Sequence, residues 1–522
     1  MMQQTTKKPP YLMIAILFIG AFVAFLNNTL LNVALPSIMK DFDVEASTVQ
    51  WLATGYMLIT GILVPASAFL ITRFKNKTLF VTSMFIFVIG TALAIWSPTF
   101  AVLLTARMVQ AVGAAVMGPL LMNVMLVSFP VEKRGTALGI FGLVMIMAPA
   151  IGPTLSGFLV EHFSWHYLFI VILPFAVIAL LLAIFKFDNI METRHVTIDI
   201  LSVILSTIGF GGLLYGFSTA SSAGWDAFKV WGTIAIGAIG LIVFVVRQIK
   251  LEKPLLSLET YKSPMFALSS AISVVNAMAL FSGMILIPLY VQNVRGIEPL
   301  DAGLMLLPGA LIMGIMSPIT GKLFDKIGPR PLAVVGMTII IVTTYFFTQL
   351  ELTTTYVHLI LIYSIRMLGI SLVMMPIMTN GLNSLPQRLN PHGTAINNTL
   401  QQVAGAIGSA VMITIMTNRA KSSAEDMDIE ATVTQKAQDK AMELIAGGTD
   451  QAEAQVQAAK FAKDLASTMA KQAQVDGINF AFLISTFIAV VALILSLFLK
   501  RVKVNAVNSG AVEKETTEKE HA

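Results

Sequence analysis

Long apolar runs separated by short polar segments dominate the pattern along this chain. Runs of about 20 residues match the length of a helix that crosses a bilayer. They recur fourteen times, centred near residues 22, 60, 88, 111, 146, 176, 208, 238, 279, 312, 341, 366, 406 and 489. The runs near 208 and 406 are richer in polar residues than the others. The pattern therefore predicts an all-α integral membrane protein with 14 transmembrane helices.

One long polar segment, residues 418–477, interrupts this pattern and is rich in Ala, Gln, Lys, Glu and Asp. Its apolar residues recur at roughly helical spacing, at Ile429, Val433, Ala437, Ala441 and Leu444. Gly447-Gly448 then breaks the spacing, and Thr449 or Asp450 could cap a second helix. We predict a helical hairpin here, with a solvated linker as the alternative.

The composition agrees with a chain that is mostly solvated by lipid. Of its 522 residues, 56% are hydrophobic and 12% are charged, whereas soluble domains are about one quarter charged. The chain has no cysteine, which excludes disulfides and thiolate metal sites. The pI of about 9.2 does not indicate nucleic-acid binding, because the basic residues lie at the ends of the apolar runs.

Lys and Arg also distinguish the two sides of the predicted membrane. If both termini are cytoplasmic, the short outside loops hold only Lys40, Lys229 and Arg295. This asymmetry fits the rule that positive residues stay inside. An odd number of spans or the opposite orientation would destroy it. We predict a multi-pass protein of the plasma membrane with both termini cytoplasmic, and no cleavable signal peptide.

The first and second halves of the chain contain matching motifs. Arg107 matches Arg366, and Gly135-Thr-Ala matches Gly393-Thr-Ala in nearly the same register. Parallel repeats of this kind are the major facilitator arrangement. The domains that we predict are a cytoplasmic N-terminus at 1–10, a six-helix half at 11–187, two extra transmembrane helices at 198–248, a second six-helix half at 264–500 containing an extracellular loop at 418–477, and a cytoplasmic tail at 501–522.

Residues 142–158 form an apolar helix that glycines and prolines interrupt. The glycines would let another helix approach closely, and the prolines remove backbone donors in the middle of the span. The pattern resembles the antiporter signature in the fifth helix of major facilitator exporters. The resemblance implies a helix that bends and slides against a neighbour, and its candidate positions are Gly142, Pro149, Gly152, Pro153 and Gly157.

The loop after the tenth run resembles the cytoplasmic loop signature of the same superfamily. It places an acid at a helix end, a Gly turn and cations that could pair with a neighbouring helix, at Gly321, Asp325, Gly328 and Arg330. Such a latch can hold one side closed and break in the other state. Its first-half counterpart has Ala68, Thr72 and Lys75 where the family prefers Gly, Asp and Gly, and only Arg73 and Lys77 keep their character. We therefore predict a latch that differs between the halves.

Arg107 lies inside the fourth run, where a charged side chain must face a partner or water. The segment resembles the family's fourth-helix motif, whose arginine is linked to proton transfer. This makes Arg107 the candidate proton relay. The alternative is an arginine that bonds backbone carbonyls, and for its repeat copy, Arg366, a structural role is favoured.

Residues 25–36 resemble the first-helix motif of fourteen-span drug:proton antiporters of the EmrB/QacA type, in a branch like that of lincomycin efflux. The family usually carries an Asp or Glu at the position of Asn27 or Asn28, and this chain has neither. No run has an Asp or Glu at its middle. Coupling could then use edge carboxylates or a histidine, or the protein could be an uncoupled carrier or a neutralised variant.

A polar set within the runs could face a central cavity, because unpaired amides are costly in lipid. The alternative role for each is to hydrogen-bond neighbouring helices. The cavity candidates, with one aromatic neighbour, are Phe25, Asn27, Asn28, Asn32, Gln110, Asn123, Asn276, Asn397, Asn398 and Gln401.

Neither a catalytic triad nor a nucleotide-binding loop appears in the sequence, so we predict no enzyme activity, no metal and no cofactor. The resemblance implies a monomeric multidrug exporter that moves small amphipathic substrates across the lipid bilayer by alternating access, driven by the proton gradient. The alternatives are an exporter of an endogenous lipid, cell-wall precursor or signalling metabolite, an uncoupled facilitator, and a membrane sensor that does not transport.

Overall fold

The computed structural model describes residues 10–191, 193, 199–252, 254–448 and 450–502. Throughout this part the chain is helical and contains no strand. Thirteen helices there are long and apolar enough to cross a membrane, so the protein is a multi-pass membrane protein. Helix α6 (Arg134–His162) is not among the thirteen, and the side chains of its residues 149, 150 and 153 lie outside the described residues.

The first part of the chain forms α1 and α3 to α7, joined by short turns. Their bounds are α1 Tyr11–Asp41, α2 Ala46–Val49, α3 Trp51–Arg73, α4 Asn76–Ile95, α5 Phe100–Ser128, α6 Arg134–His162 and α7 Tyr167–Lys186. Local signals place the boundaries, as where the Thr99 hydroxyl accepts the Val102 N–H at the start of α5. One continuous hydrophobic cluster lies mainly among these helices.

The last part of the chain forms α10 to α16, with a second hydrophobic cluster. The bounds are α10 Pro264–Leu289, continued by one π-helical turn at Tyr290–Val294, α11 Pro299–Ile327, α12 Pro329–Phe346, α13 Tyr356–Asn383, α14 Asn390–Asp426, α15 Ile429–Ala446 and α16 Gln451–Ser496. Gly328 has φ of +84° between α11 and α12, a conformation that favours glycine. The domain limits given above stay a prediction.

Helices α8 (Ile200–Ala223) and α9 (Phe228–Lys250) form an antiparallel pair between these two parts. Their backbones approach closely at glycines, since a Cβ on Gly212 would lie 2.8 Å from the Cα of Gly237. Helix α8 packs on α3 and α14. The pair therefore covers one of the two places where the first and last parts of the chain meet, and α6 packed on α11 is the other.

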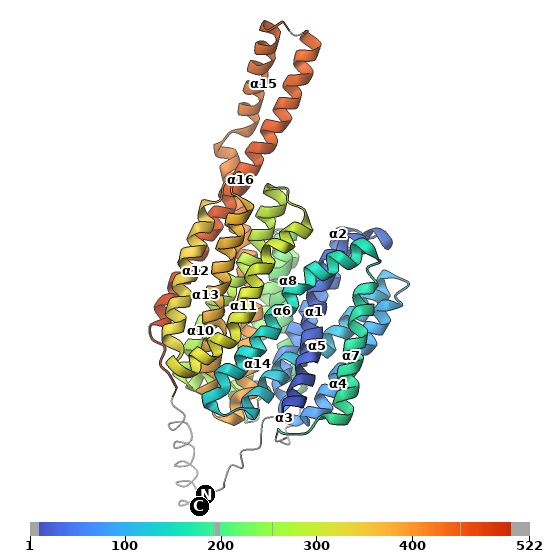
Figure 1. The fold of residues 1–522 in the computed structure, drawn as a ribbon, viewed down its shortest axis with the longest axis vertical. Helices are drawn as coiled ribbons and strands as arrows, with labels where there is room; N and C mark the ends of the chain where they lie inside the picture. Colours follow the sequence, from blue (N-terminus) through green and yellow to red (C-terminus); the bar gives the residue numbers. More distant parts are fainter. Residues whose placement is uncertain (1–9, 192, 194–198, 253, 449, 503–522) are drawn as a thin grey trace, which may run out of the picture.

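The predicted hairpin forms, and it projects beyond the bundle as α15 and the beginning of α16 (Figure 1). The Asp450 carboxylate accepts the N–H of Ala452 at the start of α16, as one of the two cap candidates requires. The other candidate, Thr449, lies outside the described residues, as does the chain from 503 onward. Helix α14 starts at the end of the bundle opposite this hairpin.

Candidate functional site

The carboxylate of Asp325 joins α11 to the first turn of α6. One oxygen accepts the backbone N–H of Gly135 at 3.0 Å. The other accepts the N–H of Thr136 at 2.9 Å and its hydroxyl at 2.7 Å. The first N–H groups of a helix have no partner within the helix, and the helix dipole favours an anion there. Asp325 therefore caps a helix that belongs to the other half of the chain.

Small residues let α6 and α11 touch along the turns next to this cap. A Cβ on Gly321 would overlap the carbonyl oxygen of Gly135. The Ser317 hydroxyl donates to the carbonyl of Gly139 at 2.7 Å, and a Cβ on Gly142 would overlap that hydroxyl. The ring of Phe324 on α11 also lies against Gly135, because a Cβ there would overlap it. We call the cap and this glycine contact the Asp325 latch, made of Asp325, Gly321, Ser317 and residues 135–142.

The segment that follows α16 contacts the same latch. The Arg501 guanidinium donates to the backbone oxygens of Asp325 at 2.6 Å and Lys326 at 3.1 Å. These are among the last carbonyls of α11, which have no partner within the helix. Asn380 on α13 holds this segment by donating to the carbonyl of Lys500 at 3.2 Å. Arg330 is exposed and Arg73 is half-buried.

The meeting of α3 and α14 has no such cap among the described residues. A Cβ on Gly393, the counterpart of Gly135, would meet the side chains of Leu385, Leu382 and Phe266. The Thr394 hydroxyl has no hydrogen-bond partner in the described part of the chain. Thr72, which stands where the family has an acid, donates to the carbonyl of Ala68 in its own helix at 2.7 Å. The α3–α14 contact therefore differs in chemistry from the α6–α11 contact, which the Asp325 carboxylate caps.

Arg107 on α5 is fully buried, and its partners lie on α1, α3 and α5 itself. Its Nη1 donates to the side-chain oxygen of Gln110 at 2.9 Å and to the backbone oxygen of Asn27 at 3.4 Å. Its Nε donates to the backbone oxygen of Leu52 at 3.4 Å. Its guanidinium lies 4.3 Å from the centre of the Tyr56 ring, close enough for a cation–π contact. The arginine is thus held by neutral groups.

Amides complete this network. Asn27 donates to the Gln110 side-chain oxygen at 3.2 Å, and Gln110 donates to the Thr91 hydroxyl at 2.9 Å. Asn28 takes part in none of these bonds and is half-buried. Of the two positions where the family usually has an acid, only Asn27 therefore reaches Arg107. We call Asn27, Thr91, Arg107 and Gln110 the Arg107 network.

Arg366 on α13 is the repeat copy and is also fully buried. Its Nη2 donates to the carbonyl of Ala279 on α10 at 2.7 Å. Its Nε and Nη1 have no hydrogen-bond partner among the described residues. The guanidinium fits against Gly283, because any Cβ there would overlap it. The second half thus repeats the arginine without the amide network.

The other predicted cavity residues are spread over several helices. Asn123 donates to the carbonyl of Pro119 in its own helix at 2.8 Å. Asn276 and Asn397 are buried, and each has one side-chain atom without a partner in the described part. Phe25, Asn398 and Gln401 are half-buried. The backbone of Asn32 is helical, but its side chain lies outside the described residues.

The fifth-helix glycines face different neighbours. Gly142 contacts Ser317 of α11, whereas Gly152 packs against Thr29 and Leu30 of α1. Gly157 is half-buried, and the side chains of Pro149 and Pro153 lie outside the described residues. Helix α6 therefore touches α11 beside the latch and α1 nearer its other end.

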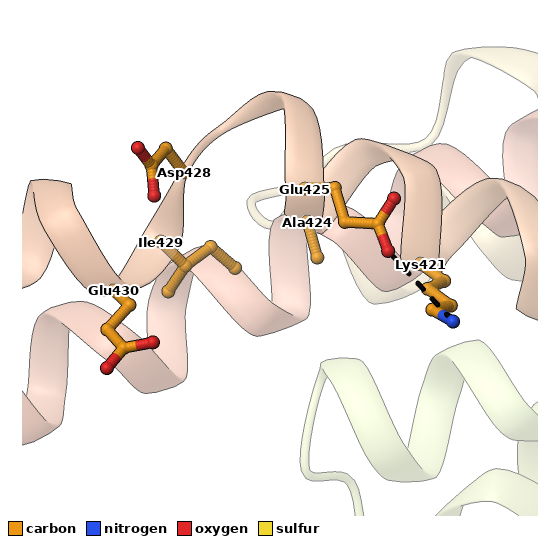
Figure 2. Close-up of a pocket in the computed structure, with 6 residues that line it drawn as sticks. All are labelled: Lys421, Ala424, Glu425, Asp428, Ile429 and Glu430. Atoms are coloured by element: carbon orange, nitrogen blue, oxygen red, sulfur yellow. Dashed lines mark ion pairs between the residues drawn. The ribbon is translucent and has the colours of Figure 1, made fainter.

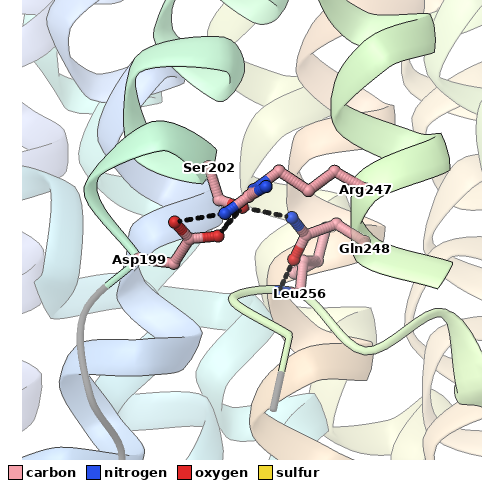
Figure 3. Close-up of polar contacts among 5 residues, drawn as sticks. All are labelled: Asp199, Ser202, Arg247, Gln248 and Leu256. Carbon is pink, nitrogen blue, oxygen red and sulfur yellow. Dashed lines mark hydrogen bonds and ion pairs between the residues drawn. The ribbon is translucent and has the colours of Figure 1, made fainter. Parts of the chain in front are cut away.

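A polar group that we did not predict anchors the extra helix pair (Figure 3). Arg247 of α9 forms a bidentate ion pair with Asp199 at 2.8 and 3.0 Å, and this bond holds the pKa of Asp199 at about 2. Gln248 donates to Ser202 at 2.6 Å, and its oxygen accepts the Leu256 N–H at 3.2 Å. A signal was present, since two consecutive spans return Asp199 and Arg247 to the same side of the membrane.

The segment after α9, residues 254–263, is held at further points against the start of α14 and the turn Gln387–Leu389 that precedes it. His392 Nδ1 accepts the Ser257 N–H at 3.2 Å. Arg388 donates to Glu259 at 2.8 Å, and this bond lowers the pKa of Glu259. Leu255 and Leu256 are buried in the first hydrophobic cluster. No residue-type pattern in the sequence predicts these contacts, because each joins a side chain to distant backbone or to one of many surface charges.

The hairpin carries a separate hollow at the turn between α14 and α15. Its volume is about 390 Å³, and Figure 2 shows its lining of Lys421, Ala424, Glu425, Asp428, Ile429 and Glu430. Lys421 lies 4.0 Å from Glu425, and both side chains are largely exposed. Within the described residues no group of three His, Asp or Glu side chains could hold a metal ion. The hollow lies outside the bundle and holds none of the predicted site residues.

Comparisons with known proteins agree on one family. Residues 17–409 match the Major Facilitator Superfamily. The chain is 45% identical to the uncharacterized MFS-type transporter YhcA of Bacillus subtilis (strain 168), over 96% of this chain and 95% of that protein. It is 42% identical to the lincomycin resistance protein LmrB of the same organism, over 95% and 96%.

A solved structure supports the fold alone. The human organic anion transporter MFSD10 (TETRAN) superposes with a TM-score of 0.61 at 11% sequence identity, covering 92% of this chain and all of that one.

Proposed function

This chain belongs to the Major Facilitator Superfamily, whose members are transporters rather than enzymes, and on that premise we propose that it exports small amphipathic compounds, drugs among them, from the cytoplasm. Its similarity to a lincomycin resistance protein along nearly the whole chain supports export of drugs. We further propose that α6 is the fourteenth span, that the Asp325 end is cytoplasmic, and that the protein acts as a monomer in the plasma membrane.

We base the proposal of alternating access on the Asp325 latch. It joins the two halves through a carboxylate on backbone N–H groups and through contacts between small residues. Hydrogen bonds of this kind can exchange for water when the helices separate. In this conformation the latch is closed. Its opening would expose the space between the halves to the cytoplasm while the outer side closes.

Accumulation of substrate inside everted membrane vesicles tests the proposal. Vesicles that contain the protein should accumulate an amphipathic fluorophore when a pH gradient is imposed, and control vesicles should not. Accumulation that an uncoupler does not affect would support a facilitator in place of an antiporter. Binding without accumulation would support a sensor and contradict export.

We also propose that Arg107 is the proton-linked residue, acting through its fixed charge on a group that titrates elsewhere, since neither a guanidinium nor an amide exchanges a proton near neutral pH. Changing Arg107 to Ala should reduce export at least tenfold and flatten its dependence on pH, because that charge is lost and Gln110 and Asn27 lose the cation that orders them. Arg107→Lys should retain part of the activity, since it keeps the charge and loses the fork of donors. Initial rates in vesicles between about pH 6 and 8 measure both effects.

Elution of each variant as a single species in detergent is the control for folding. An Arg107→Ala protein with the wild-type rate and pH profile would show that Arg107 has no part in coupling. Its role would then be the structural one, bonding to backbone carbonyls.

For the ion pair of Asp199 we predict no effect on the pH dependence of transport. Because the folded-state pKa is lowered to about 2, the pair is fully formed above the usual pKa of about 4 and is lost only as the pH falls toward 2. Asp199 therefore stays ionised throughout the range in which transport is measured. Asp199→Asn should leave the shape of the pH profile between about pH 5.5 and 8 unchanged. A shifted profile in the same vesicle assay would contradict this assignment.

A further inference from the structure

Two positive charges lie inside the bundle, and no negative charge among the described residues balances them. The side chains of Arg107 and Arg366 are each 0% exposed. Their hydrogen-bond partners are backbone oxygens and one neutral amide. None of the ion pairs in the described part of the chain includes either residue. A guanidinium does not lose its proton in proteins, so both charges persist at neutral pH.

Both arginines lie well within their spans. Arg107 is the seventh residue after Phe100, about 10 Å along α5 at 1.5 Å per residue, and Arg366 is the tenth after Tyr356, about 15 Å along α13. Neither helix contains an Asp or Glu. The buried polar residues of the described part include no carboxylate at all. The acids lie at helix ends, in connecting segments or in the hairpin.

Each arginine packs within its own half, Arg107 against α1 and α3 and Arg366 against α10, so it acts on a substrate between the halves through its electric field. A medium of low dielectric constant screens a charge weakly, so its field extends well beyond hydrogen-bonding distance. The guanidiniums also keep donors to spare, because Nη2 of Arg107 and Nε and Nη1 of Arg366 have no partner among the described residues. Guanidinium donors suit carboxylate and other oxyanion groups. A permanent cation meets repulsion, and the described part of the chain offers no buried acid with which it could pair.

We propose that this transporter selects its substrates by charge, exporting neutral and anionic amphiphiles that carry a carboxylate or similar oxyanion and discriminating against permanent cations. The inference rests on the proposed export function. A cation inside the membrane needs a negative partner, and here the neutral Asn27 occupies the position beside Arg107 where such a partner could stand.

One fluorophore in three charge states provides the test. A coumarin that carries a carboxylate, its methyl ester or a quaternary ammonium group on the same linker is offered to everted vesicles. Potassium with valinomycin removes the membrane potential, so that charge acts only through the protein. We expect the carboxylate and the ester to accumulate, and the quaternary ammonium compound at least tenfold more slowly than the carboxylate.

Three variants test whether the effect comes from the buried arginine charges. Arg366→Gln should reduce the preference for the carboxylate over the ammonium compound at least threefold, whereas Arg366→Lys, which keeps the charge, should retain it. Asn27→Asp should move the preference in the same direction as Arg366→Gln, because it adds a carboxylate to the Arg107 network.

The two possible failures are distinct. If wild-type vesicles accumulate the ammonium compound as fast as the carboxylate, the inference on charge is overturned and export stands. Equal preferences in Arg366→Gln and Arg366→Lys would likewise overturn the role given to the arginine charge. If none of the three compounds accumulates, the proposed export function fails, and the inference fails with it.

Discussion

Replacing Gly321 with alanine is expected to abolish most export and to leave the bundle open at the Asp325 end. The new Cβ would overlap the carbonyl oxygen of Gly135 and lie 2.7 Å from its carbonyl carbon. Both are backbone atoms of α6, which cannot rotate away as a side chain can. The two helices must therefore separate, and the closed latch no longer forms. We expect export to fall at least tenfold, measured as vesicle accumulation.

Graded glycine variants separate this effect from general damage. Gly142→Ala should be milder, because its Cβ would meet the hydroxyl of Ser317 and side-chain atoms of Met375, which can move. Gly232→Ala in α9 is the matched control, since the nearest atoms to its Cβ belong to the ring of Phe228 at 3.6 Å. That variant should export within twofold of the wild type. A Gly321→Ala protein with wild-type export would show that the close contact is not needed for transport.

The second large effect is expected from removing the carboxylate of Asp325. Asp325→Ala loses three hydrogen bonds to the start of α6. Charge-assisted bonds contribute about 1.5–3 kcal/mol each when buried, and Asp325 is only half-buried, so we take about 2 kcal/mol for the set. This free energy corresponds to about a 30-fold shift from the closed toward the open latch. Asp325→Asn keeps an acceptor oxygen and should lie between the alanine variant and the wild type.

The absence of cysteine from the natural sequence makes this shift measurable. A single cysteine at Ser317, which is 1% exposed in the closed latch, should react slowly with a membrane-permeant maleimide. In the Asp325→Ala background we expect its labelling rate to rise at least tenfold. Asp301→Asn at the other end of α11 is the control, because its side chain is exposed and distant in sequence from the latch. Unchanged labelling in Asp325→Ala would mean that the carboxylate does not hold the halves together.

The same substitutions distinguish the latch from the coupling step. Gly321→Ala and Asp325→Ala should alter the balance between conformations and lower the rate at every pH. Arg107→Ala should alter the response to pH itself. If all three variants changed only the rate, Arg107 would belong with the structural residues and the route of the proton would lie elsewhere in the chain.

The linear sequence predicted the membrane spans because their signal is local. About 20 apolar residues need no distant partner to be recognised as a span, and thirteen of the predicted runs fall in helices long and apolar enough to cross a membrane. The hairpin was predicted for the same reason, from helical spacing and the Gly447-Gly448 break. Asp325 stood out because its loop resembles a family signature, although nothing in the sequence identified its partner.

Contacts between distant segments were decided by the tertiary structure. The partner of Asp325 is the backbone of residues 190 positions away, and a backbone N–H has no residue type by which a sequence could reveal it. The choice between Asn27 and Asn28 depended on which side of α1 faces α5. The missing counter-charge of Arg107 and Arg366 required knowing every neighbour of two buried side chains.

What the sequence by itself determined is therefore thirteen of the spans, the hairpin, the superfamily and the lack of an acid within the spans. These follow from hydropathy, spacing and residue identity, which are properties of short segments. Only the tertiary structure decided that Asp325 caps α6, that glycines permit the α6–α11 contact, and that Gln248 and His392 hold the segment after α9. Hydrogen bonds and close approach depend on distances of a few ångströms between helices, and no local pattern encodes them.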